Sequence, residues 1–472
     1  MIRRRRDRGF ALIVVLFLSA LLTLLMYTFL REMQVEHGLA VSSGREAQAR
    51  QLAWSAVEKA QVVLAAETTP VFSPTTKWFD DPDEWYEIEL GDGVFSMIRA
   101  TPEADGKLRY GIADEASRIN LNTATKAVLM KLPKATDEIV DSIIDWRDAD
   151  EEPQPAGAEN THYQSLSKPY KCKNGPFTTV EELLLVKGMT PEILYGEDWN
   201  QNGILDANEN DGDKSPPADN ADGTLDFGFA SFLTVYSYDK NVRNDGSARV
   251  NVNSATPQQL QDALGDVLNG GEIQQVIARR PYATVAHLLP MGGPPPGGLS
   301  LDKWKQIVDR ITVLPPEANS PGLVNVNTAS KKVLEMLPGF TAEDISKIVA
   351  YRTQEGVDLS TVGWLADALQ VAEQPVQTNQ KLAQIVPFVT TRAFQYRFDV
   401  VARIGPKSER QATSTTVKTM DPSAAPPPAR VMRRLVVIFD RGGQSGAGRI
   451  VYARDITRLG QPYPIEEPAG NR

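Results

Sequence analysis

A twelve-residue segment near the middle of the 472-residue chain carries the side chains with the clearest chemical meaning. Residues 198–209 read DWNQNGILDANE, with oxygen-bearing side chains at positions 1, 3, 5, 9 and 12 and glycine at position 6. Ca²⁺ prefers several oxygen ligands, and this is the spacing of a calcium-binding loop. The expected ligands are Asp198, Asn200, Asn202, the Ile204 carbonyl, Asp206 and Glu209. We therefore predict one bound Ca²⁺, and call residues 198–209 the calcium loop.

Further acidic residues follow the calcium loop in a stretch with few large apolar side chains. They are Asp211, Asp213, Asp219, Asp222 and Asp226. Such a stretch buries too little apolar surface to order itself, so we expect a second Ca²⁺ among the first four. A solvated acidic loop is the alternative. We expect Ca²⁺ to stiffen residues 196–228 and to hold the adjoining helices against a sheet.

No pattern in the sequence supports catalysis. His37, His162 and His287 are far apart in the sequence, and there is no nucleophile elbow, P-loop or dinucleotide fingerprint. Residues 292–298 are rich in glycine and proline, and we interpret them as a linker because proline lacks the amide that binds phosphate. The single cysteine, Cys172, excludes an intrachain disulfide. We expect a non-enzymatic protein.

Three copies of one sequence pattern indicate three related helical modules. The copies begin INLNTAT at 119, VNVNSAT at 250 and VNVNTAS at 324, and later tags read FTTV at 177, YATV at 282 and LSTV at 359. Thr125, Thr256 and Ser330 fit helix N-caps, and Pro257 fits a first helical position. The paired asparagines should bond nearby backbone. We place the modules at 113–235, which includes the calcium loop, 245–315 and 320–389.

Strand patterns flank these modules at both ends of the chain. Short segments rich in aromatic and β-branched residues recur within 67–112 and 390–440, separated by turn residues such as Gly91-Asp92-Gly93. We expect one antiparallel sheet built from both ends, with the modules as insertions and residues 441–472 as a C-terminal tail. The predicted fold class is α+β.

The N-terminus reads as a membrane anchor. Residues 10–30 carry no charge, and a helix of that length is about 30 Å long, which matches the hydrocarbon core of a bilayer. The arginines before it are Arg3, Arg4, Arg5, Arg6 and Arg8. This positive flank predicts a cytoplasmic N-terminus and a single pass, with the bulk of the chain outside. Residues 31–66 should extend the helix beyond the membrane.

The Arg8-Gly9-Phe10 sequence directly before the apolar run resembles the class III leader of type IV pilins and type II secretion pseudopilins. The resemblance implies that residues 1–9 are removed by a prepilin peptidase and that Phe10 is methylated. Major pilins carry glutamate at the fifth mature position, where this chain has Val14. An unpaired carboxylate in lipid is costly, so its absence suggests a filament tip. A simple signal anchor is the alternative.

Three further segments are similar to the protein K family of minor pseudopilins in type II secretion systems. They are DEASRIN at 114–120, DWRDAD at 145–150 and PFTTVEELLLVKGMT at 176–190. The resemblance implies a pilin-like helix and sheet interrupted by sterile-alpha-motif-like (SAM-like) domains, with calcium near the calcium loop. It implies a periplasmic pseudopilus tip that takes part in protein secretion from the inner membrane. Implied partners are other minor pseudopilins, the major pseudopilin, the assembly platform, the prepilin peptidase and membrane lipid.

The modules also resemble helix-hairpin-helix modules of DNA-uptake proteins, which hold phosphate with a glycine-rich hairpin. Only LPGFT at 337–341 approaches that hairpin, because the first copy reads LPKAT at 132–136 and the second has no matching turn. A formal net charge of −10 further disfavours nucleic acid as a partner. The alternatives left open are a minor pilin of a type IV pilus or DNA-uptake system and a membrane-anchored calcium-binding scaffold.

Overall fold

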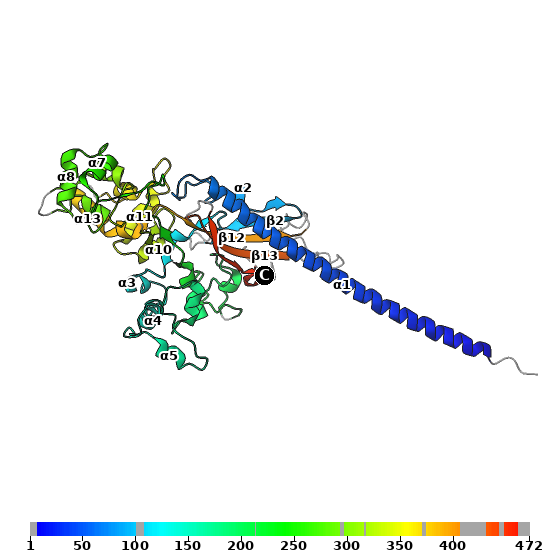
Figure 1. Cartoon of the computed structure of the whole chain (residues 1–472). Coiled ribbons are helices and arrows are strands. Elements are labelled where there is room, and N and C mark those ends of the chain that lie inside the picture. The colour runs from blue at the N-terminus through cyan, green and yellow to red at the C-terminus, as the bar shows by residue number, and fades with distance from the viewer. Residues whose placement is uncertain are drawn as a thin grey trace, which may run out of the picture.

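The computed structural model joins one long N-terminal helix to a body made of a sheet and helical modules (Figure 1). It describes residues 7–100, 108–212, 214–292, 297–315, 318–370, 374–405, 431–442 and 448–460. The helix, the antiparallel sheet and the inserted helices confirm the predicted α+β class.

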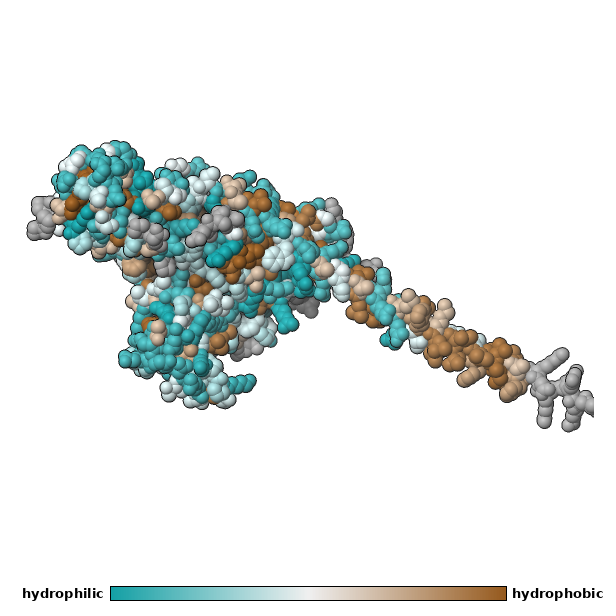
Figure 2. Space-filling view, in the orientation of Figure 1, coloured by the Kyte–Doolittle hydropathy of each residue, from teal (hydrophilic) through white to brown (hydrophobic). Residues whose placement is uncertain are grey.

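Helix α1 (Asp7–Ala66) has two parts with different surroundings. Its N-terminal part has a mean hydropathy of 2.7 over an 18-residue window, none of it buried, and is long and apolar enough to cross a membrane. Figure 2 shows this apolar surface on the projecting part of the helix. From Ala49 to Leu64 one face is buried against the sheet, where small residues such as Ala53, Ala56 and Ala60 allow close approach. The predicted helical extension to residue 66 is confirmed, and Val35 and Leu39 remain exposed.

The main sheet is antiparallel and has the order β1-β2-β12-β13-β14, with β3 paired to β12. Its strands are β1 (Ile88–Leu90), β2 (Gly93–Ile98), β3 (Ala113–Asp114), β12 (Gln395–Ile404), β13 (Val431–Asp440) and β14 (Arg449–Asp455). The two ends of the chain therefore meet in one sheet, as predicted. The predicted tail at 441–472 is wrong for Arg449–Asp455, because these residues form the edge strand β14.

Each module opens and closes with a two-residue parallel strand pair. The pairs are β4 (Ile119–Asn120) with β5 (Leu233–Thr234), β7 (Val250–Asn251) with β8 (Ile311–Thr312), and β10 (Val324–Asn325) with β11 (Val389–Thr390). The pairs bring the ends of each module together, so each module is a closed insertion.

The helices between these strands are short. In each module at least two helices come before a 3₁₀ turn at the downstream tag, and at least one helix follows it. The first module has α3 (Lys126–Leu129), α4 (Asp137–Arg147), α5 (Asn160–Gln164), η2 (Val180–Leu185), α6 (Pro191–Tyr195), η3 (Ala207–Glu209) and η4 (Phe229–Ser231). The second has α7 (Pro257–Leu264), α8 (Gly270–Ala278), η5 (Val285–Leu288) and α9 (Leu301–Ile307). The third has α10 (Lys331–Met336), α11 (Ala342–Tyr351), η6 (Val362–Trp364), α12 (Leu365–Ala368), α13 (Pro375–Ile385) and η7 (Val386–Phe388). One apolar core runs through all three modules.

The remaining elements connect these parts. They are α2 (Pro82–Trp85), η1 (Glu115–Ser117), β6 (Tyr238–Asp239), β9 (Ser320–Pro321) and η9 (Thr457–Leu459). Antiparallel pairing of β6 with β9 joins the segment before the second module to the segment after it. The second and third modules lie at the end of the body opposite the projecting part of α1 (Figure 1). The first module lies to one side of the sheet.

The predicted helix caps are confirmed in two modules of three. Thr256 and Ser330 accept hydrogen bonds from the Gln259 and Val333 amides, and Pro257 occupies the first turn of α7. Thr125 stands at the N-cap of α3, but its side chain accepts no capping bond, so that part of the prediction is wrong.

Candidate calcium loop and the contacts of the modules

The calcium loop brings its five predicted side-chain ligands into the protein interior. Asp198, Asn200, Asn202, Asp206 and Glu209 are all buried. The chain turns sharply between them because Gln201 and Gly203 take positive φ angles of 56° and 76°. Glycine adopts this conformation without strain, which explains its place at position 6.

Hydrogen bonds inside the loop hold the carboxylates in place. Asp198 accepts the Asn202 amide at 2.9 Å and the Gly203 amide at 3.1 Å, while Glu209 accepts the Trp199 and Asp206 amides at 3.1 Å each. Oδ2 of Asp206 accepts Nδ2 of Asn200 at 2.6 Å and Nδ2 of Asn202 at 3.0 Å.

The acidity of these groups reflects their burial. Burial raises the pKa of Asp198 to about 6, against the opposing effect of the Asn202 and Gly203 amides. Burial, with the charge of Asp198 second, raises the pKa of Glu209 to about 8. A divalent cation favours the ionised forms, and an asparagine amide can present its oxygen instead of its nitrogen to such an ion. The residues of the loop therefore fit a calcium site.

The acidic residues beyond the loop mostly shape turns. Asp219 accepts the amides of Asp211, Gly212 and Ala221, Asp211 accepts the Ser215 hydroxyl, and Asp222 accepts the Thr224 amide. Asp213 lies outside the described residues. These contacts bring Asp211 and Asp219 together but include no contact of Asp222 with either.

Two residues that were not predicted from the sequence bind the calcium loop and the segment after it to their surroundings. Glu197 is buried and accepts the Asp226 amide at 2.9 Å and the Asn220 amide at 3.3 Å, which closes the segment that follows the loop. Arg434 on β13 is fully buried, and it donates to the carbonyl oxygens of Asn200 and Gln201 and to Asp399 on β12 at 2.7 Å. The loop is thus bonded directly to the sheet. The only sequence signal was the pair Arg433-Arg434 directly before the apolar run of β13.

The paired asparagines of the repeats bond nearby backbone, as predicted, and they also bond distant backbone, which was not predicted. The first asparagine of each pair accepts the amide of the second, at 2.9 Å in the first module, 2.8 Å in the second and 3.1 Å in the third. The second asparagine then binds the downstream tag: Asn122 exchanges two bonds with Phe177, Asn253 exchanges two with Tyr282, and Asn327 donates to the Leu359 carbonyl. The tags are therefore the binding partners of the asparagines.

The hairpin of the third module, which comes nearest to a phosphate-binding hairpin, is in contact with α13. A Cβ at Gly339 would lie 3.1 Å from Cβ of Gln384, and Lys381 donates to the Gly339 carbonyl at 3.2 Å. At the corresponding turn of the first module Lys134 has a φ of 57°, and nearby Lys131 donates to the Glu335 carbonyl of the third module. The Gly339 turn therefore serves a contact within the chain.

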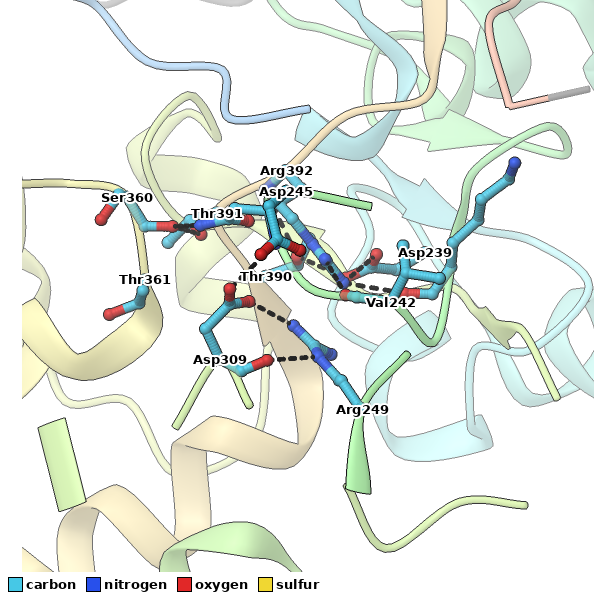
Figure 3. Close-up of polar contacts among 12 residues, drawn as sticks. Asp239, Val242, Asp245, Arg249, Asp309, Ser360, Thr361, Thr390, Thr391 and Arg392 are labelled. Atoms are coloured by element: carbon cyan, nitrogen blue, oxygen red, sulfur yellow. Dashed lines mark hydrogen bonds and ion pairs between the residues drawn. The ribbon is translucent and has the colours of Figure 1, made fainter. Parts of the chain in front are cut away.

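Polar residues gather where the segments that flank the second and third modules meet (Figure 3). Buried Arg392 pairs with Asp239 at 2.6 Å, and Thr390 donates to the same carboxylate at 2.6 Å. Arg249 pairs with Asp309 at 2.9 Å on the other side. These residues line a cavity of about 270 Å³, together with Lys240 and with apolar residues of both modules such as Val285 and Val386.

Comparison with known proteins gives matches to one family. Residues 114–195 match the family model described as Type II secretion system (T2SS), protein K. Type II secretion system protein K of Aeromonas hydrophila is 26% identical over 215 residues, which cover 40% of this chain and 61% of that protein. The Pseudomonas aeruginosa protein of the same name is 28% identical over 206 residues, covering 39% and 58%. The chain thus spans about three-fifths of the length of these relatives.

A solved structure matches along most of the chain but only loosely. One chain of the crystal structure of the GspK-GspI-GspJ complex from the type 2 secretion system of enterotoxigenic Escherichia coli has a TM-score of 0.39 and 12% identity, with coverage of 90% of this chain and 97% of that one. The matched family model covers the first module up to α6, directly before the calcium loop. By this match and the two bacterial relatives, the chain is similar over part of its length to type II secretion system protein K.

Proposed function

We propose that this protein is a minor pseudopilin at the tip of a type II secretion pseudopilus, where it takes part in protein secretion across the outer membrane. The observation that carries the proposal is the combination of one long apolar helix, packed on an antiparallel sheet, with a first module that matches protein K. The role is non-enzymatic. Its partners are other minor pseudopilins, the major pseudopilin and the assembly platform.

The placement of the modules supports a tip position. The second and third modules lie beyond the packed end of α1, opposite the part that projects from the body (Figure 1). In a filament whose core is built from parallel α1 helices, this bulk would block addition of a subunit above. Val14 fits the same position, because a terminal subunit has no buried neighbouring amine for a carboxylate to neutralise.

The topology we propose is a single pass through the bacterial inner membrane with a cytoplasmic N-terminus and a periplasmic body. The basic residues before the apolar run support this orientation. We propose that the prepilin peptidase cuts after Gly9 and that Phe10 is methylated. Arg3, Arg4, Arg5 and Arg6 lie outside the described residues, and α1 is helical across the Gly9–Phe10 bond.

We propose that Ca²⁺ binds the calcium loop and holds the first module against the sheet. Asp198, Asp206 and Glu209 would supply carboxylate oxygens, with amide oxygens from Asn200 and Asn202 and the Ile204 carbonyl. Ordering of this loop would also fix the Asn200 and Gln201 carbonyls that Arg434 binds. A second Ca²⁺ would use Asp211, Asp219, Asp222 and Asp213.

Complementation of a deletion strain tests the proposed function. The source bacterium without this gene should retain the cargo of its type II pathway in the periplasm, and the intact gene should restore its release to the medium. A chain that ends after residue 66 keeps α1 and serves as the matched control, because it lacks the sheet and modules. Normal release without the gene would contradict the proposal.

The rival DNA-uptake function has a direct test of its own. Salt-sensitive binding of the full chain to duplex DNA would favour it, because phosphate contacts weaken steeply with ionic strength. The contact of α13 with the Gly339 turn supports a scaffold role for the third module instead.

A further inference from the structure

A second group of acidic residues lies in the first module, away from the calcium loop. Asp148 follows the end of α4, Asp150 lies two residues later, and Glu159 stands at the N-cap of α5. One carboxylate oxygen from each of the three lies within 4.8 Å of the other two. The connection between α4 and α5 therefore brings three carboxylates close together.

Glu159 is the unusual member of this group. Its side chain is only 4% exposed and both carboxylate oxygens are enclosed; no nitrogen or hydroxyl of the described residues donates to them, and the weakly donating Cys172 thiol lies beside them. It occupies an N-cap position, yet its side chain caps no amide. Oδ1 of Asp148 is likewise enclosed, with no partner in the part of the chain that the structure describes. Burying an anion without a strong donor is unfavourable, which makes these oxygens candidates for ligation.

The surrounding charges do not neutralise the group. Asp145 and Glu151 add further negative charge near Glu159. Arg147 acts on Asp148, but its guanidinium donates to the Leu121 and Ala124 carbonyls. Glu151 differs from the three, because Asn160 and Asn174 donate to it. The three remaining carboxylates thus attract a positive ion.

We propose that Asp148, Asp150 and Glu159 bind a divalent cation of the Ca²⁺ class, separate from the calcium loop. Their donors are oxygens, which hard cations prefer. The twelve-residue span from Asp148 to Glu159 equals that from Asp198 to Glu209, with acidic residues at positions 1 and 12 in both and an oxygen-bearing side chain at position 3. Asp150 is exposed and gives the ion a route from solvent to the buried Glu159. The ion would fasten the long connection between α4 and α5.

Calcium binding to the full chain in detergent tests this proposal, with Glu159→Gln as the main variant. Glutamine keeps the shape of the side chain and removes its charge. Equilibrium dialysis should show about one Ca²⁺ fewer per chain for Glu159→Gln than for the wild type. Glu152→Gln is the matched control, because Glu152 is an exposed acid of the same loop outside the group, and it should leave the stoichiometry unchanged.

Hydrogen exchange locates the effect and separates it from folding. At free Ca²⁺ about ten times the dissociation constant, exchange in residues 148–160 of the wild type should slow about tenfold. In Glu159→Gln this slowing should disappear, while residues 198–209 keep their own response. Without Ca²⁺ the variant should be at least as protected as the wild type, because it removes repulsion.

Three results would overturn the proposal. The first is a hydrogen-exchange rate in residues 148–160 of the wild type that does not change when Ca²⁺ is added. The second is an equal number of bound Ca²⁺ per chain in Glu159→Gln and the wild type. The third is slower exchange of these residues with Zn²⁺ but not with Ca²⁺. None of these results depends on the secretion function, so failure here and failure of the complementation experiment are separate outcomes.

Discussion

Arginines that are buried or half-buried hold the ends of the helices to the turns that start each module. Arg147, Arg280 and Arg352 lie at or just after the ends of α4, α8 and α11, and each donates to the carbonyl of an alanine in the opening turn: Ala124, Ala255 and Ala329. A planar guanidinium with several donors can satisfy two carbonyls at once, as in the first and third modules. These residues are therefore structural, and the oxygen-rich loops carry the binding chemistry.

Glu209→Gln should abolish the stabilisation of the first module by Ca²⁺ at the calcium loop. The neutral amide keeps the side-chain shape but loses the twelfth-position carboxylate. At free Ca²⁺ about a hundred times the dissociation constant, the wild type should gain about 2.7 kcal/mol of stability over the chelated protein. Thermal unfolding and protease sensitivity with chelator or with Ca²⁺ measure this gain. Asp302→Asn, an exposed acid of the second module, is the control and should keep the full response.

Ionisation of Asp114 should lower the free energy of unfolding as the pH rises from about 4 to about 6. Burial raises the pKa of Asp114 to about 6, despite hydrogen bonds from Asn325 and Thr328. The folded state then holds a proton that the unfolded chain has released, so stability falls across this window. In Asp114→Asn the free energy of unfolding should decrease by about 1–3 kcal/mol less over this pH range than in the wild type. Unfolding by denaturant at pH 4, 5, 6 and 7 compares the variant with the wild type, and parallel curves would exclude the effect.

The modules are defined by contacts between a repeat and a distant tag, which explains what the sequence could predict. The repeated asparagines and the tags FTTV, YATV and LSTV were visible as patterns, and the structure joins them. The closing strands β5, β8 and β11 were missed because two residues are too short for a periodic signal. Arg434 and Glu197 were missed because a single charged residue has no pattern. Strand β14 was missed because it lies beyond the last recognised apolar strand.

Asn253→Ala should loosen the second module without unfolding the other two. The change leaves the amide and carbonyl of Tyr282 without their partners, which costs about 2 kcal/mol when such groups are buried. Hydrogen exchange should become faster in residues 250–312 and stay the same in residues 119–195. Gln258→Ala, on the exposed face of α7, is the matched control. Uniform acceleration along the chain would show that the modules do not open separately.

At the scale of the whole molecule, the body connects a membrane helix to modules at its far end through the sheet. Helix α1 packs on β2, β12 and β13, and Arg434 of β13 contacts the calcium loop of the first module. Asp114 and Asn325 join the start of the first module to the start of the third. The sheet therefore connects α1 to the first and third modules.

Arg434→Met should separate the calcium loop from the sheet. The substitution leaves Asp399 buried without its cation, which costs about 3–5 kcal/mol locally. Residues 198–209 should then become sensitive to protease even with Ca²⁺ present. Arg434→Met combined with Asp399→Asn should recover part of the protection, because the double variant removes the unpaired charge. If the single variant is as resistant as the wild type, the arginine does not couple the loop to the sheet.

The mass of the mature N-terminal peptide tests the central claim most directly. Protein extracted from membranes of the source bacterium should yield a peptide that begins at Phe10 and carries one methyl group, because cleavage after Gly9 leaves α1 ready to join a filament. The matched variant Gly9→Leu should keep Arg8 and the residues before it. A wild-type protein that retains its arginines, with no methylated Phe10, would contradict the account.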